Sequence, residues 1–512
     1  MTESEFAALA ARGYNRIPVT LETFADLDTP LSIYLKLANK PFSYLLESVI
    51  GGERFGRYSI IGLPAREWLR VKGKECAVVR AKSGGQTETL KHVFVKDPLT
   101  FVERYRKRFN AAPIDGALRF AGGLAGYFSY DTVRYIEHKL ELEDHQQKKD
   151  VIGAPDIVLM LSDELAVVDN LSGKLHLIVY VDVAAYGATP GGTAAAYAYA
   201  QRRLTELRLG LRQQAPLPVY VPASATNVQG NEPKSEIGKE AFLKAVAKCK
   251  QYIVDGDIMQ VQISQRISQP FDAPPINLYR ALRSINPSPY MFYFDMGEFH
   301  IVGASPEILV RQEGSKVTVR PIAGTRKRGA TPERDRELEQ ELSSDPKELA
   351  EHLMLIDLGR NDIGRIAKIG SVKVTEQMVV ERYSHVMHLV SNVDGEIRDD
   401  VGPIDLLRAT FPAGTVTGTP KVRAMEIIDE LEPSKRGVYA GAAGYLGFNG
   451  NMDLAIAIRT GIVKDGTLYV QAAAGIVADS VAELEWQETE SKARALLRAA
   501  EMVSAGIDTN PS

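Results

Sequence analysis

Cysteine is almost absent from this sequence. Cys76 and Cys249 are the only two in 512 residues, too few for a disulfide framework or for a cysteine-ligated zinc site. Neither lies in a glycine-flanked turn of the kind that presents a nucleophile. We therefore expect two ordinary free thiols without a catalytic role.

Long hydrophobic runs and an excess of either charge are also missing. No apolar stretch approaches the length of about 20 residues that spans a bilayer, and the first 20 residues lack the pattern of a secretory signal. Together these absences predict a cytoplasmic protein. The 61 basic and 65 acidic residues nearly cancel, which argues against a dedicated nucleic-acid or membrane partner. A small anionic substrate stays possible, because a few local basic groups can bind it.

The chain is longer than the size at which one hydrophobic core usually stops growing. We predict an N-terminal region over 1–210, a linker or exposed loop over 211–237, and a C-terminal region over 238–505. The linker is rich in Pro, Gln, Ser and Asn and has no sustained period. Short β-rich runs come in clusters, which favours an α+β fold over a doubly wound sheet.

Local patterns predict individual elements within these regions. Alternation indicates strands at 91–95 and 175–181, and composition indicates a helix over 194–210. Helical spacing of apolar residues predicts a helix over 238–255, followed by a strand from 259 to 264.

Four glutamates in two pairs form the strongest chemical pattern. Asp345 and Pro346 suit the start of a helix, and the spacing of three then places Glu348 and Glu351 on one helical face. Glu485 and Glu488 repeat this spacing, with Lys492 one turn further along. Two facing pairs would offer the hard oxygen ligands that magnesium prefers.

Each pair alone has a structural interpretation as well. Glu348 could complete a capping box with Asp345, and Glu488 could form a surface ion pair with Lys492. Spacing by itself therefore leaves a metal site and ordinary helix chemistry both open.

Five stretches resemble, in the same order, signature motifs of the chorismate-utilising enzymes. They are Gly-Ala-Ser-Pro-Glu at 303–307, Pro-Ile-Ala-Gly-Thr-Arg at 321–326, Glu-His-Leu-Met-Leu-Ile-Asp-Leu-Gly-Arg-Asn-Asp at 351–362, Gly-Thr-Pro-Lys at 418–421, and Ala-Asp-Ser at 478–480, which leads into the second glutamate pair. The resemblance covers about 240–500 and implies a large composite antiparallel β-sandwich flanked by helices. The N-terminal region is similar to that of the large subunits (component I) of the anthranilate synthases.

The resemblance assigns roles to residues at matching positions. It implies that Glu351 and Glu488 bind Mg2+ directly, that Glu348 and Glu485 hold the ion's waters, and that the ion anchors the ring carboxylate of chorismate. Arg459 is implied to bind the enolpyruvyl carboxylate through a two-point contact. The further substrate contacts that it implies are Tyr439, Ala474, Gly475, Thr415, Gly324, Thr325 and Lys492.

His388 is the implied general base, and Glu307 is the implied acid. His388 lies in an apparent strand and shares a face with Val386 and Val390, so it could equally be a core histidine. The family match favours a general base. Glu307 would be the acid that helps the ring hydroxyl depart, and this role requires a raised pKa.

Two positions separate the reactions known in the family. Members that add water have a lysine base where this chain has Gln260, and an amide cannot deprotonate water. Aminodeoxychorismate synthases have a nucleophilic lysine where this chain has Ala323. The resemblance thus implies an anthranilate synthase lyase, which combines chorismate and ammonia to give anthranilate and pyruvate in tryptophan biosynthesis.

The chain shows no glutaminase signature, so we expect a separate glutamine amidotransferase subunit, anthranilate synthase component II, in a heterotetramer. Two alternatives remain: an aminodeoxychorismate synthase component I, and a catalytically silent tryptophan-binding subunit. The complete set of implied catalytic residues argues against the silent subunit.

A feedback site for L-tryptophan is implied as well. The stretch containing Glu47 and Ser48, together with 57–59, resembles one wall of this site. The stretch containing Pro289, Tyr290 and Met291 resembles the other wall. These segments could also be plain strand core and a proline turn.

Overall fold

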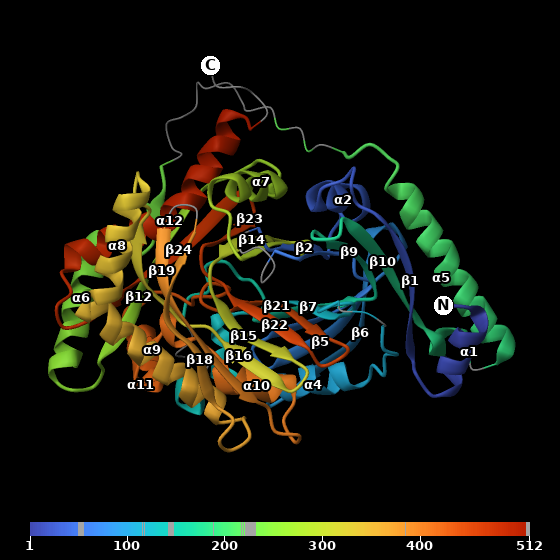
Figure 1. Ribbon diagram of the computed structural model, residues 1–512, viewed down its shortest axis with the longest axis horizontal. Helices are drawn as coiled ribbons and strands as arrows, with labels where there is room; N and C mark the ends of the chain where they lie inside the picture. The colour runs from blue at the N-terminus through green and yellow to red at the C-terminus, as the bar shows by residue number, and fades with distance from the viewer. Residues whose placement is uncertain are drawn as a thin grey trace.

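The computed structural model describes residues 1–507 except 50–55, 115, 117, 142–147, 188, 217, 219, 221–231, 384 and 385. Residues 217, 219 and 221–231 of the predicted linker 211–237 therefore lie outside the described residues. The strands form two large antiparallel sheets, and helices pack on their outer faces (Figure 1). The predicted α+β fold with a composite antiparallel sandwich is confirmed.

The first sheet joins strands from both halves of the chain. Its order is β1 (Arg16–Phe24), β10 (Lys174–Asp182), β9 (Glu164–Asp169), β3 (Tyr58–Gly62), β2 (Ser43–Glu47), β13 (Tyr290–Asp295), β14 (His300–Ser305), β23 (Thr460–Lys464), β24 (Thr467–Ile476), β12 (Gln260–Pro270) and β11 (Lys234–Ser235), with β20 (Gly418–Thr419) beside β12. The junction between the two halves is the antiparallel pair β2–β13, in which Leu45 lies opposite Tyr293.

The second sheet is built in the same mixed way. Its order is β17 (Ile322–Lys327), β19 (Val386–Glu396), β16 (Lys316–Val319), β15 (Ile308–Glu313), β22 (Met452–Ile456), β21 (Ala442–Gly447), β7 (Gly123–Phe128), β8 (Ile157–Ser162), β4 (Glu67–Lys72), β5 (Glu75–Ala81) and β6 (Thr87–Phe94), with β18 (Lys373–Arg382) beside β19. Here β7 from the N-terminal region pairs with β21 from the C-terminal region. Gly126 and Gly444 lie opposite each other in this pair. A Cβ on Gly126 would overlap the Val158 carbonyl of β8, and one on Gly444 would overlap the Asp453 carbonyl of β22.

Helices cover the outside of both sheets. They are α1 (Glu3–Ala11), α2 (Pro30–Leu37), α4 (Pro98–Lys107), α5 (Pro190–Gly210), α6 (Lys239–Val254), α7 (Pro275–Ile285), α8 (Pro332–Ser344), α9 (Pro346–Gly364), α10 (Pro403–Thr410), α11 (Lys421–Leu431) and α12 (Ala482–Ala505). On the first sheet α5 packs against β10 and α12 against β24, whereas α9 packs against β17 and β19 of the second. None of the helices in the described residues is long and apolar enough to cross a membrane.

Aromatic side chains fill the space between the two sheets. Phe292 and Phe294 from the first sheet belong to one buried cluster with Trp68, Tyr127 and Tyr445 from the second. Burial of such large rings supplies much of the apolar free energy that holds the layers together. The relative position of the two sheets is thus fixed by a packed core that contains residues from both halves of the sequence.

The two cysteines lie in this framework as free, buried residues. Burial raises the pKa of each thiol to about 12. Neither therefore forms a thiolate near neutral pH, as expected from the sequence.

Candidate active site

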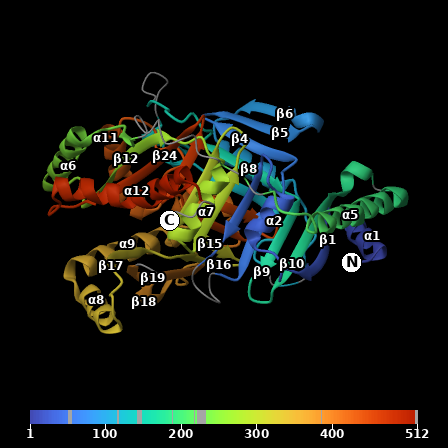
Figure 2. The same cartoon turned by 90° about the horizontal axis from the view of Figure 1, so that it is seen from above.

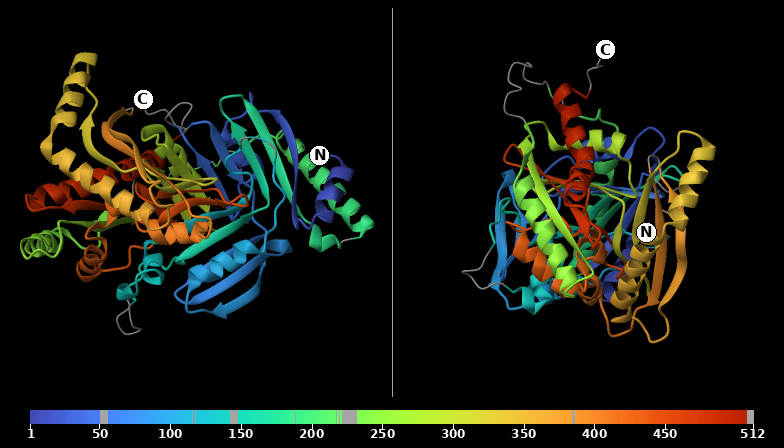
Figure 3. Two further views of the ribbon diagram at one scale, coloured as in Figure 1. Left: turned by 60° about the horizontal axis from the view of Figure 1, so that its bottom comes forward. Right: turned by 90° about the vertical axis from the view of Figure 1, so that its left-hand side faces the viewer.

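The candidate catalytic residues gather where one end of the first sheet faces one end of the second. Viewed from above, α12 lies over the first sheet and α9 lies beside the second (Figure 2). Seen end-on, α12 runs between α6 on one side and the α8–α9 pair on the other (Figure 3). The two glutamate pairs are carried on α9 and α12, one helix for each sheet.

Helix α9 begins where the sequence predicts. The Asp345 side chain accepts hydrogen bonds from the backbone N–H groups of Lys347 and Glu348, and Pro346 occupies the first turn. Glu348 then pairs with Arg326, whose Nη1 lies 3.0 Å from its Oε1. Glu351 accepts a hydrogen bond of 3.0 Å from the Gln260 amide on β12. This bond joins α9 of one sheet to a strand of the other.

The second pair begins helix α12. Glu488 forms an ion pair of 2.5 Å with Lys492, one turn further along. Lys492 also donates to the Ala473 carbonyl on β24 at 2.9 Å, which attaches this part of α12 to the sheet. Burial, together with the nearby Glu488 charge, raises the pKa of Glu485. Both glutamates of this pair therefore lie near the Lys492 charge at the start of α12.

The carboxylates suit magnesium in chemistry but do not form a preassembled cage. Within the part of the chain that the structure describes, no three His, Cys, Asp or Glu side chains converge closely enough to hold a metal by themselves. Glu351 and Glu488 instead accept from Gln260 and Lys492. Magnesium often uses only one or two carboxylates and takes its remaining ligands from water and substrate. One carboxylate from each helix is consistent with that mode of binding.

Glu307 lies at the end of β14 and is 7% exposed. Burial raises the pKa of its carboxyl to about 8, although the Thr415 hydroxyl and the Lys492 charge act in the opposite direction. The Thr415 hydroxyl is itself buried and lies close to this carboxyl. A protonated carboxyl and a buried hydroxyl thus face the same space, as a site for a polar ligand requires.

His388 lies on β19, as the sequence predicts. Its Nδ1 is 3.0 Å from the Gly324 carbonyl and 3.1 Å from the Thr325 hydroxyl. Because a carbonyl only accepts, Nδ1 carries the proton and Nε2 keeps its lone pair. Burial lowers the pKa of His388, and the Arg459 charge adds to this effect against the Gly324 hydrogen bond. A neutral imidazole whose Nε2 keeps its lone pair is the form that a general base needs.

The Gly324 conformation explains why glycine occupies this position. Its φ is +61°, and a Cβ there would lie 2.9 Å from Leu342 and 3.1 Å from the Glu348 carboxylate. Any side chain would therefore strain the turn and press on the first glutamate pair.

Arg459 and its neighbours form the side of the site near the first sheet. Burial lowers the pKa of Arg459, while Tyr439 and Glu488 raise it, so both lie close to the guanidinium. The Tyr439 hydroxyl is near the backbone of Ala473, and burial raises its pKa to about 12. At Gly475 a Cβ would lie 2.9 Å from the Gln260 amide nitrogen. Gly475 therefore leaves room for the amide that holds Glu351.

The structure also pairs two motif residues to which the sequence assigns no role. Lys421, at the start of α11, lies 2.8 Å from the Asp362 carboxylate near the end of α9, and both side chains are largely buried. Burial raises the pKa of Asp362, and the Lys421 charge opposes this shift. Asp362 and Lys421 each end one of the five motifs described above. That is the sequence signal that could have suggested that they pair.

The candidate tryptophan residues lie together in a second place, between β2 and β13. Glu47, Ser48, Pro289, Tyr290 and Met291 all line one cavity of about 90 Å³. The buried Glu47 carboxylate accepts from the Tyr279 hydroxyl at 2.5 Å and from Arg283 at 3.1 Å, both on α7. We call this space the effector cavity.

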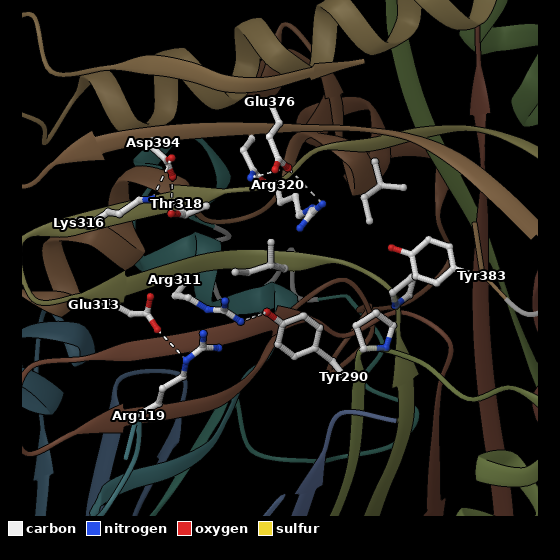
Figure 4. A pocket seen from close by; sticks show the side chains of 15 residues that line it. Arg119, Tyr290, Arg311, Glu313, Lys316, Thr318, Arg320, Glu376, Tyr383 and Asp394 are labelled. Atoms are coloured by element: carbon white, nitrogen blue, oxygen red, sulfur yellow. Dashed lines mark hydrogen bonds and ion pairs between the residues drawn. The ribbon is translucent and has the colours of Figure 1, made fainter. Parts of the chain in front are cut away.

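A larger cavity of about 450 Å³ adjoins the effector cavity, and Arg119, Pro289, Tyr290 and Arg311 line both. Charged pairs surround it, including Arg119 with Glu313 and Lys316 with Asp394 (Figure 4). Pro306 and Ile308, the neighbours of Glu307, line this polar cavity too. We call this larger space the polar cavity; it lies next to the effector cavity and to the neighbours of Glu307.

Comparisons with known proteins agree with this arrangement. The family model described as chorismate binding enzyme matches residues 63–498. Anthranilate synthase component 1 of Neisseria meningitidis serogroup A is 56% identical over 508 residues, which cover 99% of this chain and 100% of the relative. That of Pseudomonas putida is 56% identical over 510 residues, with the same coverage.

Solved structures agree as well. The crystal structure of anthranilate synthase component I from Streptococcus pneumoniae aligns with a TM-score of 0.71 at 36% identity, covering 93% of this chain and 98% of that one. The menaquinone-specific isochorismate synthase of Escherichia coli shares the fold, with a TM-score of 0.69 at 18% identity over 97% of this chain and 99% of that one. The family model, the full-length relatives and the fold together show that the chain belongs to the chorismate binding enzyme family and, within it, to the anthranilate synthase component 1 proteins.

Proposed function

We propose that this chain converts chorismate and ammonia to anthranilate and pyruvate, as a lyase of tryptophan biosynthesis. The observation that carries the proposal is the convergence of Glu307, Arg459 and His388 with carboxylates from α9 and α12. Gln260 supports ammonia over water as the nucleophile, because its amide is no base and instead holds Glu351.

The chain's own residues supply binding and proton transfer. Arg459 takes the enolpyruvyl carboxylate of chorismate by two-point hydrogen bonding, and Tyr439 with the backbone of Ala474 and Gly475 completes that side. Thr415, Gly324, Thr325 and Lys492 are the further proposed substrate contacts. These groups hold the ring between Glu307 and His388.

Proton transfers then follow from the two shifted pKa values. Glu307, protonated at neutral pH, gives its proton to the ring hydroxyl as ammonia adds to the carbon next to the carboxylate-bearing carbon. Water departs and leaves an amino-deoxyisochorismate. The added ammonium group loses a proton to become the amine, which restores the proton of the site's acid. Nε2 of His388 then takes the ring proton from the carbon that bears the amine, the ring C–O bond breaks to release the enolate of pyruvate, and the ring becomes aromatic. The enolate takes up a proton to give pyruvate, so no net proton is gained or lost in this step.

We further propose Mg2+ as the cofactor, with Glu351 and Glu488 as direct ligands and Glu348 and Glu485 holding its waters. When bound, the ion would supply positive charge beside the substrate's ring carboxylate. Support comes from the donor chemistry of the two helices, because carboxylate oxygens are the ligands that this ion prefers.

A direct assay tests the reaction without any partner. The purified chain is mixed with chorismate, an ammonium salt at alkaline pH and magnesium, and anthranilate fluorescence is followed. We expect a signal that disappears with EDTA. Consumption of chorismate without fluorescence would point to another product, such as that of an aminodeoxychorismate synthase. Untouched chorismate would favour the silent regulatory subunit.

The relatives are named component 1, and a partner component goes with that name. We propose that the partner is a glutamine amidotransferase that delivers ammonia, in a cytoplasmic heterotetramer. Glutamine-dependent activity that appears only after the partner is added, alongside unchanged ammonium-dependent activity, is the expected result.

We also propose that L-tryptophan binds the effector cavity and inhibits the enzyme. Ser48 lines this cavity, whose volume of about 90 Å³ leaves little spare room. A Ser48→Phe substitution should fill the space, weaken tryptophan inhibition at least tenfold and preserve ammonium-dependent activity. An enzyme with this change that tryptophan still inhibits fully would place the effector elsewhere.

A further inference from the structure

A short series of hydrogen bonds connects the effector cavity to Glu307. The backbone N–H of Val49, which follows Ser48, donates to the Ser288 carbonyl at 3.2 Å. The Ser288 hydroxyl donates to the Ser305 carbonyl at 2.7 Å. The Ser305 hydroxyl in turn bonds the backbone of Glu307, accepting from its N–H at 3.3 Å and donating to its carbonyl at 3.2 Å. We call Ser288 and Ser305 the serine relay.

Burial makes these bonds significant. Ser288 is 4% exposed and Ser305 is fully buried, so water cannot readily replace either contact. The Ser305 hydroxyl bonds both backbone groups of Glu307. A second bond, from the Ile456 N–H to the Glu307 carbonyl at 3.0 Å, holds the same peptide to β22. The position of the Glu307 carboxyl therefore depends on where Ser305 lies.

The effector cavity is small, so a ligand that fills it should displace its walls. Its volume of about 90 Å³ is well below the roughly 300 Å³ at the lower end for small-molecule sites. One wall contains Ser48 and the other contains Pro289. The relay is attached to both walls, because Val49 follows Ser48 and Ser288 precedes Pro289.

The polar cavity provides space for such a movement. Packed interiors resist displacement because they contain few voids. Pro289 and Pro306 flank the two relay serines in sequence, and both line the cavity of about 450 Å³. Displacement of the Pro289 wall can therefore carry Ser288 and Ser305 toward open space without compressing the core.

We propose that Ser288 and Ser305 are positioning residues that link occupancy of the effector cavity to the placement of the Glu307 carboxyl. The inference rests on the proposed inhibition by tryptophan and adds the path by which inhibition reaches the catalytic residues. Tryptophan binding and chorismate binding then weaken each other through the relay. Glu307 is well placed when the effector cavity is empty and is displaced when tryptophan fills it.

Reciprocal binding measures this link directly. Tryptophan is titrated calorimetrically into the whole chain with magnesium and without ammonia, in the presence and absence of chorismate. Coupled sites typically alter each other's affinity about 5- to 150-fold. We expect chorismate to weaken tryptophan binding at least fivefold in the unaltered chain.

The Ser288→Ala chain should bind tryptophan within about threefold of normal when chorismate is absent, while the effect of chorismate falls below about twofold. Ser305→Ala should lose the coupling as well and also lower kcat, because it loosens the Glu307 backbone. The double variant should show no further loss of coupling, since the two serines act in series.

Ser371→Ala is the matched control. The Ser371 hydroxyl also bonds two backbone groups, those of Lys368 and Glu396, and lines neither cavity. This variant should keep normal coupling.

Normal coupling in Ser288→Ala and Ser305→Ala would overturn the relay. Loss of tryptophan binding in Ser288→Ala would make that serine part of the cavity wall, which also contradicts the proposal. Failure of tryptophan to bind the unaltered chain would refute the effector site and the relay together, while the ammonium assay would still report on catalysis.

Discussion

At the scale of single residues, Glu307 shows how burial sets chemical function. Its pKa of about 8 means that the acid form persists through neutral pH, far above the usual range of a glutamate. Because the proposed step requires that proton, activity should decrease as pH rises through about 8. The measurement is kcat against pH at a fixed saturating concentration of free ammonia, so that ammonium titration does not distort the profile.

A Glu307→Gln substitution tests the assignment. It keeps the shape of the side chain but carries no transferable proton, so kcat should fall by about 10²- to 10⁴-fold. The residual activity should lack the decrease near pH 8. Glu313→Gln is a suitable control, because Glu313 lies on the next strand and pairs with Arg119. An unchanged profile in Glu307→Gln would remove Glu307 from the acid role.

Some of the candidate site could be predicted at this scale. A capping pattern at Asp345 and a spacing of three placed Glu348 and Glu351 on one helix, because both signals are local. The partners of these carboxylates could not be predicted. Gln260 is 91 residues from Glu351 in sequence, and only the pairing of sheets and helices brings the two together.

At the scale of elements, helix α12 links the candidate site to the core. Leu496 is 1% exposed and belongs to the buried cluster that includes Leu278 and Leu468. Leu496→Ala should lower the free energy of unfolding by about 2–5 kcal/mol. The same change should raise the KM for chorismate, because Lys492 lies one turn and Glu488 two turns away on the same helix.

Denaturant unfolding and steady-state kinetics would measure the two effects. The control is Arg498→Ala, since Arg498 is exposed on α12 and pairs only with Glu501 in the described residues. A stability loss without any change in KM would show that α12 holds its site residues independently of its packing.

The elements differ in how well the sequence predicts them. The predicted helix over 238–255 matches α6 within one residue at each end. The helical spacing of Glu485, Glu488 and Lys492 is confirmed by α12, which carries all three. The helix predicted over 194–210 begins earlier, at Pro190, since Thr189 caps it at Gly192. The start at Pro190 was not predicted because Gly191 and Gly192 follow it, and glycine is normally unfavourable in helices.

At the scale of the whole molecule, neither half of the sequence forms a complete sheet by itself. We predict that fragments 1–216 and 232–512 will not fold when expressed separately, because separation exposes β2, β13, β7 and β21 as unpaired edges. Co-expression should restore a complex with ammonium-dependent activity. Circular dichroism with thermal melting, and co-purification of the fragments, are the measurements. Cooperative melting of the C-terminal fragment alone would contradict this expectation.

Sheet order is the feature that the sequence predicted least. Clusters of strands indicated an α+β fold, and family resemblance indicated a composite sandwich. The neighbours β7 and β21 pair across more than 300 residues. Alternation along one strand reports which face is buried but not which distant strand lies beside it.

This interleaving has a consequence during synthesis on the ribosome. Strand β7 (Gly123–Phe128) emerges long before its partner β21 (Ala442–Gly447). At about 5–20 residues per second, the nascent chain waits roughly 15 s to a minute before that pair can form. Throughout this interval apolar strands such as β8, whose residues are all buried in the finished protein, lack part of their covering. The order of strands in the sheet thus sets how long the nascent chain needs protection from aggregation.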